Sequence, residues 1–188
     1  MAFAPSDAPR PVKIVVAGGF AVGKTTFVGS ISEIRPLTTE AVMTSASAAV
    51  DNTGQAVAKT TTTVAMDFGR ITLAEGLRLY LFGTPGQDRF WFMWDDLVKG
   101  AIGAVVLVDT RRLADCFPAV DYFESRGLPF IVAVNRFNGV AAHRAVAVRE
   151  ALALPGSAPI VYCDARDRES TKATLVALVE HVIAFATA

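Results

Sequence analysis

One run of the sequence has the residue types and spacing that bind phosphate. Residues 18–26 read GGFAVGKTT, which satisfies the pattern GxxxxGK followed by Ser or Thr. Gly18 and Gly23 let the backbone curl so that successive N–H groups face phosphate oxygens. Lys24 can reach the β- and γ-phosphates, and the Thr25 hydroxyl can bind Mg²⁺. We therefore predict a nucleotide phosphate site made of Gly18, Phe20, Ala21, Val22, Gly23, Lys24, Thr25 and Thr26.

Two further stretches have the residues that could sense a γ-phosphate. Thr63 opens a predicted strand, and a threonine there can fold onto the metal when a triphosphate is bound. The Gly86 N–H can meet the γ-phosphate, and Gln87 can orient the attacking water. Lys24 and Gln87 are thus the predicted catalytic residues, and Thr25 and Thr63 the predicted Mg²⁺ ligands.

A base site is predicted where two later strands end. Asn135-Arg136-Phe137-Asn138 follows the apolar run PFIVAV, and Asp164-Ala165-Arg166 follows the run PIVYC. The stem of Arg136 can pack over a base, and Asn138 can read its edge. The Ala165 backbone N–H can contact a purine O6, with Arg166 beside it, while Asn135 ties loops together.

The elements that must position these residues alternate along the chain. Uncharged runs at 13–17, 101–108, 129–134 and 159–163 suit strands buried on both faces of a parallel sheet. A hairpin is predicted over 64–73 and 77–82, and helices over 24–34, 88–98, 112–125 and 175–186. This pattern predicts an α/β P-loop NTPase fold with an open, mostly parallel six-stranded sheet and helices on both faces. Residues 36–62 form a predicted functional loop.

Length and composition set the remaining expectations. The 188 residues fit a flexible tail over 1–11 and a single domain over 12–188. Basic and acidic residues number 18 each, with no basic stretch, so we expect no nucleic-acid partner. The apolar runs are too short to span a bilayer, and no lipidation box is present. We expect a cytoplasmic protein without a direct membrane anchor, recruited to membranes only through partners.

The order of these elements resembles the Ras-like small GTPases, most of all the Rab and Arf branches. The strings GGFAVGKTTFVGS, LFGTPGQDRF, VLVDTRR and CDARDRES are more particular. They resemble the bacterial GTPases encoded in actinobacterial conservon operons, which are related to the gliding-motility GTPases. The resemblance implies a Ras-like G domain that binds GTP or GDP with Mg²⁺, whose GTP-bound state a partner reads and GTP hydrolysis ends. It also implies a roadblock/LC7-type partner and a sensor-kinase-like membrane protein.

Three positions depart from that family's pattern. Gly83 stands where an aspartate usually holds Mg²⁺ through water, although another acid, such as Asp109, could serve. Phe20 stands where a small residue is usual, which predicts slow hydrolysis and a helper that repositions Gln87. Asn138 replaces the aspartate that reads guanine, which predicts a relaxed base preference. Two alternatives stay open: an ATPase or kinase that uses Asp109, or a nucleotide-binding subunit without hydrolysis.

Overall fold

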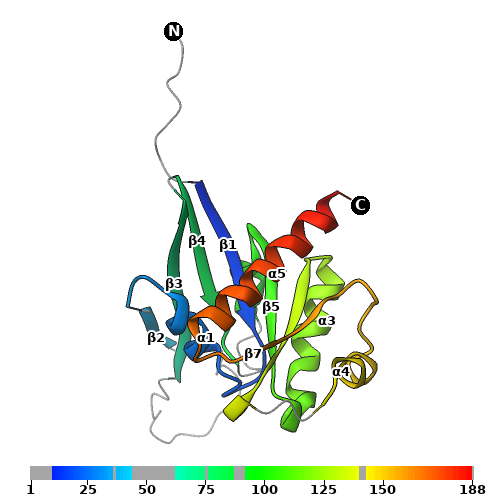
Figure 1. Cartoon of the computed structure of the whole chain (residues 1–188). Coiled ribbons are helices and arrows are strands. Elements are labelled where there is room, and N and C mark those ends of the chain that lie inside the picture. Colours follow the sequence, from blue (N-terminus) through cyan, green and yellow to red (C-terminus); the bar gives the residue numbers. More distant parts are fainter. Residues whose placement is uncertain are drawn as a thin grey trace, which may run out of the picture.

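A computed structural model describes residues 10–35, 37–43, 62–74, 76–86, 92–139 and 143–187 (Figure 1). Its seven strands form one sheet in the order β2-β3-β4-β1-β5-β6-β7. The β2–β3 and β3–β4 pairs are antiparallel and all others are parallel, which confirms the predicted α/β fold. The strands are β1 (Arg10–Ala17), β2 (Leu37–Met43), β3 (Thr62–Ala74), β4 (Leu77–Gly83), β5 (Ala101–Val108), β6 (Phe130–Asn135) and β7 (Ile160–Cys163).

The sheet has one strand more than the six predicted. Strand β2 lies in the segment predicted to be a loop, and it pairs with β3 from Leu37 opposite Phe68 to Met43 opposite Thr62. Its sequence LTTEAVM has no regular alternation of apolar and polar residues. Because strand propensity depends strongly on the neighbouring strand, the edge of β3 decides the structure here rather than the local sequence.

Helices cover both faces of this sheet. Helices α1 and α5 lie on one face, in front of the sheet in Figure 1, and α2, α3 and α4 pack on the other. Side chains alternate accordingly along β1, where Ile14 and Val16 join the core under α1 and α5 and Val15 and Ala17 join the second core. The helical segments are α1 (Lys24–Ile31), α2 (Trp94–Val98), η2 (Thr110–Cys116), α3 (Phe117–Arg126), η3 (Phe137–Gly139), α4 (Ala145–Ala151) and α5 (Arg168–Ala186).

Several predicted boundaries move slightly. Strand β1 begins at Arg10, so the predicted tail over 1–11 is two residues too long, and residues 1–9 lie outside the described ranges. Pro118 lies in the first turn of α3, where its missing N–H costs nothing. On α5, Leu178 is fully buried whereas Ile183 is 60% exposed, so the predicted apolar face is buried only in its first part.

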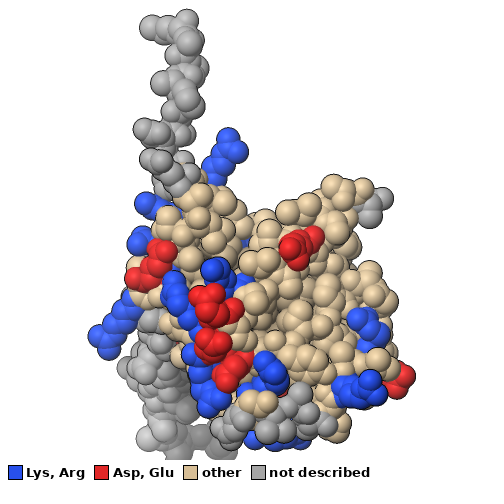
Figure 2. Space-filling model, in the orientation of Figure 1, with Lys and Arg blue, Asp and Glu red and all other residues tan. Residues whose placement is uncertain are grey.

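Charge is unevenly spread over the face seen in Figure 2. Side chains of both signs gather over α1 and the first turns of α5, while the surface around the last turns of α5 is largely uncharged. None of the helices in the described part of the chain combines the length and apolar character needed to cross a bilayer.

Candidate nucleotide site

The GGFAVGKTT loop follows β1 at the carboxyl end of the sheet and has the backbone shape of a phosphate cradle. Gly18 and Gly23 have φ of 133° and 106°, in the region that favours glycine. A Cβ on Gly18 would lie 2.3 Å from the Leu107 carbonyl oxygen, so this position also requires glycine for space. The loop leads directly into α1 at Lys24. The sequence-predicted strand, loop and helix are therefore all present.

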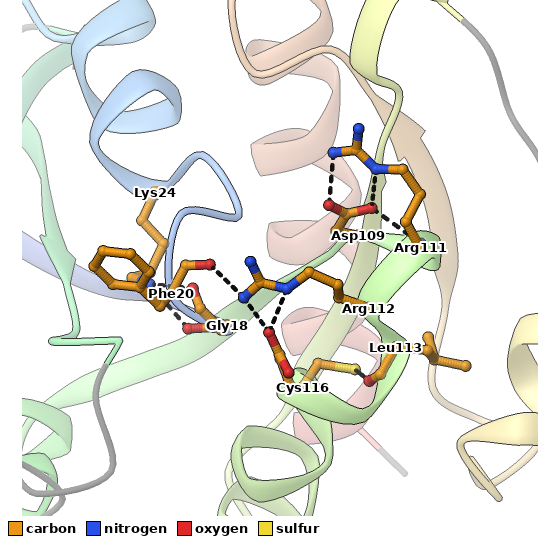
Figure 3. Close-up of polar contacts among 10 residues, drawn as sticks. Gly18, Phe20, Lys24, Asp109, Arg111, Arg112, Leu113 and Cys116 are labelled. Carbon is orange, nitrogen blue, oxygen red and sulfur yellow. Dashed lines mark hydrogen bonds and ion pairs between the residues drawn. The ribbon is translucent and has the colours of Figure 1, made fainter.

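Lys24 is buried within this loop. Its Nζ donates hydrogen bonds to the Gly18 carbonyl at 2.9 Å and the Gly19 carbonyl at 2.7 Å (Figure 3). Burial lowers the pKa of Lys24 to about 8, against the opposing effect of the Asp67 carboxylate. A bound phosphate would favour the charged ammonium and therefore raise the pKa of Lys24 again.

The carboxylate nearest Thr25 comes from β3. The Thr25 hydroxyl donates to Asp67 Oδ2 at 2.8 Å, and Asp67 is only 6% exposed. In the β3–β4 register Asp67 lies opposite Gly83, and a Cβ on Gly83 would come within 2.9 Å of the Asp67 Cβ. The side chain missing at position 83 is thus replaced by one from the neighbouring strand, and the glycine leaves room for it.

Sequence reasoning missed Asp67, although the signal was present. In the predicted hairpin, counting back along both strands from the connection between them brings residue 67 close to residue 83. The acid proposed instead, Asp109, lines a small cavity beside the phosphate loop, but its carboxylate is already engaged. Arg111 donates to its Oδ1 through Nε at 2.8 Å and to its Oδ2 through Nη2 at 2.7 Å. These hydrogen bonds lower the pKa of Asp109. Asp109 also caps η2, so its carboxylate organises that turn and not the phosphate loop.

The turn after β4 lies directly on the phosphate loop. A Cβ on Gly86 would lie 2.6 Å from Lys24 Nζ and 3.0 Å from the Phe20 Cα. Gln87 lies outside the described ranges, so its predicted catalytic role stays a prediction. The predicted Mg²⁺-binding role of Thr63 also stays a prediction. Thr63 in β3 pairs with Val42 in β2 through its backbone, but its side chain is not described.

Asn135 joins the phosphate loop to the base loops, as its predicted role requires. Its Nδ2 donates to the Val22 carbonyl at 2.9 Å, and its Oδ1 accepts the Ala165 N–H at 3.1 Å. The Ala165 N–H, predicted to contact a purine, therefore already has one acceptor. Val22 is buried, Thr26 is exposed, and Phe20 is 60% exposed at the loop surface.

The base loops carry arginine–carboxylate pairs. Arg166 binds Asp164 through Nε at 2.9 Å and Nη2 at 2.7 Å, which lowers the pKa of Asp164 to about 2. The Arg111 guanidinium lies 4.3 Å from the centroid of the Phe137 ring. The Arg136 N–H donates to the Cys163 carbonyl at 2.7 Å. Asn138 belongs to η3, and its side chain is not described, so its base-reading role stays a prediction.

The phosphate cradle at the end of β1 and the mostly parallel sheet define this protein as a P-loop NTPase-like nucleotide-binding protein with a G-domain-like fold. A family model described as "conserved hypothetical ATP binding protein" matches residues 16–185, and the chain belongs to that family.

Relatives and structural neighbours agree with this fold. The chain is 30% identical over 127 residues to the uncharacterized protein MJ1339 of Methanocaldococcus jannaschii, covering 66% of this chain and 70% of the relative. The FeoB G-domain of Methanococcus jannaschii matches with a TM-score of 0.59 at 13% identity, covering 92% of this chain and 98% of that chain. The G domain of the T. maritima FeoB iron transporter has the same TM-score of 0.59 at 17% identity, covering 94% and 99%. At these identities the structural neighbours establish the fold alone.

Proposed function

We propose that this protein is a small regulatory switch that binds GTP and GDP with Mg²⁺ and hydrolyses GTP slowly. The observation that carries the proposal is the hydrogen bond between Thr25 and the buried Asp67, made beside a phosphate loop whose lysine is already in place. Thr25 and Asp67 supply a hydroxyl and a carboxylate, the oxygen groups that Mg²⁺ prefers.

The donor set at this point fits a magnesium ion. Asp67 Oδ2 accepts the Thr25 hydroxyl, while the buried Oδ1 has no hydrogen-bond partner among the residues that the structure describes. A buried carboxylate oxygen of this kind needs a cation, a donor or water. Thr25 would bind the ion, Asp67 would hold it directly or through water, and the ion would neutralise charge on the β- and γ-phosphate oxygens.

The position of Gly86 supports a switch. Because this residue already lies against Lys24 and Phe20, a γ-phosphate at Lys24 would displace or reorder the turn after β4. The predicted water-orienting residue Gln87 follows that turn directly, so the same event would place it. The hairpin that carries Asp67 and Gly83 links this turn to the start of β3, where Thr63 is the predicted γ-phosphate sensor.

The choice of GTP rests on sequence resemblance and on structural neighbours described as G domains, while the family description names ATP. An ATPase is therefore the second candidate. The resemblance also supports the proposed roadblock/LC7-type partner and sensor-kinase-like membrane protein, through which the protein would reach a membrane. Comparing phosphate release with and without a roadblock-type protein tests this part of the proposal.

The metal assignment is tested by moving the carboxylate between strands. Asp67→Asn should weaken binding of a fluorescent GTP analogue in Mg²⁺ by about 10–100-fold and leave binding in EDTA nearly unchanged. The double variant Asp67→Gly with Gly83→Asp should recover part of the loss, because it returns a carboxylate from β4. Gly83→Asp alone should weaken binding, since its side chain meets Asp67 at 2.9 Å.

Two controls complete this experiment. Lys24→Ala should abolish measurable binding with or without Mg²⁺, while Asp121→Asn on the exposed side of α3 should change nothing. Equal losses for Asp67→Asn in Mg²⁺ and in EDTA would show that Asp67 has no part in metal binding. Binding of ATP as tight as binding of GTP would replace the GTPase proposal by the ATPase.

A further inference from the structure

The phosphate loop contains one non-glycine residue in a strained backbone conformation. Ala21 has φ of 58°, in the left-handed region that alanine rarely adopts. Such a conformation persists only where neighbouring groups hold it.

Arg112, from η2 on the other side of the loop, supplies a contact at this point. Its Nη2 donates to the Phe20 carbonyl at 3.0 Å, although the two residues are 92 positions apart (Figure 3). Its Nε donates to Asp115 Oδ2 at 2.8 Å, and Nη2 also contacts that oxygen. Arg112 has the non-helical angles φ −140° and ψ 51°, so η2 is kinked at the residue that reaches the loop.

Asp115 is fixed against the same loop. A Cβ on Gly19 would lie 2.5 Å from the Asp115 Cβ, so only a glycine lets η2 approach this closely. Asp115 thus orients Arg112 through its carboxylate while its own Cβ packs on the residue before Phe20. The planar Arg112 guanidinium is thus held by the Asp115 carboxylate and donates to the Phe20 carbonyl.

The Phe20 carbonyl controls the direction of the next N–H group. In a trans peptide the C=O of one residue and the N–H of the following residue point in opposite directions, and the described chain contains no cis peptide. Figure 3 shows Arg112 reaching the Phe20 carbonyl from the η2 side, with Lys24 on the other side of the loop. Holding that carbonyl toward η2 therefore turns the Ala21 N–H away from η2, as a phosphate-binding nest requires.

We propose that Arg112, oriented by Asp115, is a positioning residue that holds the Phe20–Ala21 peptide in the conformation that binds phosphate. This inference rests on the proposed nucleotide binding by the loop. We call the contacts of Arg112 with Asp115 and with the Phe20 carbonyl the clasp. The clasp should affect diphosphate and triphosphate binding alike, because the backbone conformation that it holds forms before either ligand arrives. Arg112 and Asp115 are 50% and 41% exposed, and an exposed ion pair of this kind contributes little to global stability.

The test compares Arg112→Ala in two backgrounds. In the otherwise wild-type chain it should weaken binding of fluorescent GDP and GTP analogues alike by about 5–10-fold, the loss expected for a charge-assisted hydrogen bond that is half exposed. In an Ala21→Gly background the same substitution should cost about twofold or less, because glycine adopts positive φ without help. Arg112→Lys should lie between, since it keeps the charge but loses the planar fork.

A matched control uses another exposed, ion-paired arginine. Arg126 pairs with Asp95 at 2.5 Å, lies over the Tyr122 ring and is 51% exposed, so Arg126→Ala reports what loss of a surface arginine costs away from the phosphate loop. Thermal midpoints should shift by only a few degrees in both variants. Unchanged nucleotide affinity in Arg112→Ala, or an equal loss in the Ala21→Gly background, overturns the clasp while leaving the proposed function standing. Wild-type protein that binds neither analogue overturns both.

Discussion

The Lys24 and Asp67 contacts at the phosphate loop are buried, whereas the predicted base end is bounded by ion pairs with exposed arginines. Lys24 and Asp67 are 8% and 6% exposed. The side chains of Arg111 and Arg166 are 63% and 58% exposed in their pairs with Asp109 and Asp164. Buried polar contacts fix geometry because leaving one partner unpaired costs about 1–3 kcal/mol, while exposed pairs contribute about 0–1 kcal/mol.

The two ends also differ in how they handle a missing carboxylate. At the phosphate end, Asp67 from β3 fills the place left by Gly83 on β4. At the predicted base end, Asn138 stands where the GTPases that the sequence resembles have an aspartate. Asp109 and Asp164, which follow the strands on either side of β6, are both held by arginine. A carboxylate therefore lies beside Thr25 at the phosphate loop, whereas both of these carboxylates at the predicted base end are engaged by arginine.

The largest expected effect is a change of base preference, which would remove the difference between the two ends of the site. Asn138→Asp should raise the preference for GTP over ATP by about 10–30-fold, because a carboxylate accepts both guanine donors while the asparagine amide leaves one unpaired. Competition of GTP, ATP and XTP against a fluorescent nucleotide measures the ratio. Ser125→Asp adds the same charge at an exposed position of α3 and should leave it unchanged. A wild-type protein that already prefers GTP by a hundredfold would contradict the expectation.

The phosphate loop and the central strands were predictable because their signals are local. The uncharged run AIGAVVLV became β5, buried on both faces, and the loop between β1 and α1 follows from the motif alone. Strand β2 was not predictable in the same way, because its sequence has no period and its structure depends on pairing with β3.

The site residues that sequence reasoning missed act across long sequence separations. Asp67 reaches Thr25 from 42 residues away, and Arg112 reaches Phe20 from 92 residues away. A motif describes residues that are close along the chain. It therefore shows that position 83 lacks a carboxylate, but not which strand brings another carboxylate close to Thr25. Asn135 was assigned its linking role correctly because it ends a strand beside the loop that it binds.

A smaller effect is the pH dependence of nucleotide affinity, which depends on the buried lysine at the phosphate end. Burial lowers the pKa of Lys24 to about 8 in the free protein, so above that pH the lysine is neutral and nucleotide binding requires proton uptake. Affinity for a triphosphate should therefore be flat below pH 8 and fall by up to about tenfold per pH unit above it.

The same lysine affects stability in the opposite direction. Between pH 8 and the ordinary lysine pKa of 10.5, the unfolded chain binds more protons than the folded chain, so Lys24 makes the free energy of unfolding rise with pH in that window. For the affinity experiment, Lys24→Arg provides the control. Its guanidinium stays charged, so its affinity for a triphosphate should not decline above pH 8. Titration of nucleotide affinity from pH 7 to 9.5 in both proteins checks this. A decline of equal slope in Lys24→Arg would assign it to another group.

The smallest expected effect separates the two candidate metal carboxylates. Asp109→Asn should change Mg²⁺-dependent nucleotide affinity by about twofold or less, because its carboxylate is held by Arg111 and caps η2. Its thermal midpoint should fall by a few degrees through loss of that cap. Measuring affinity in Mg²⁺ and in EDTA beside Asp67→Asn makes the comparison direct. If Asp109→Asn loses as much Mg²⁺ dependence as Asp67→Asn, the metal assignment to β3 is wrong, and an ATPase organised around Asp109 becomes the better explanation of the same phosphate loop.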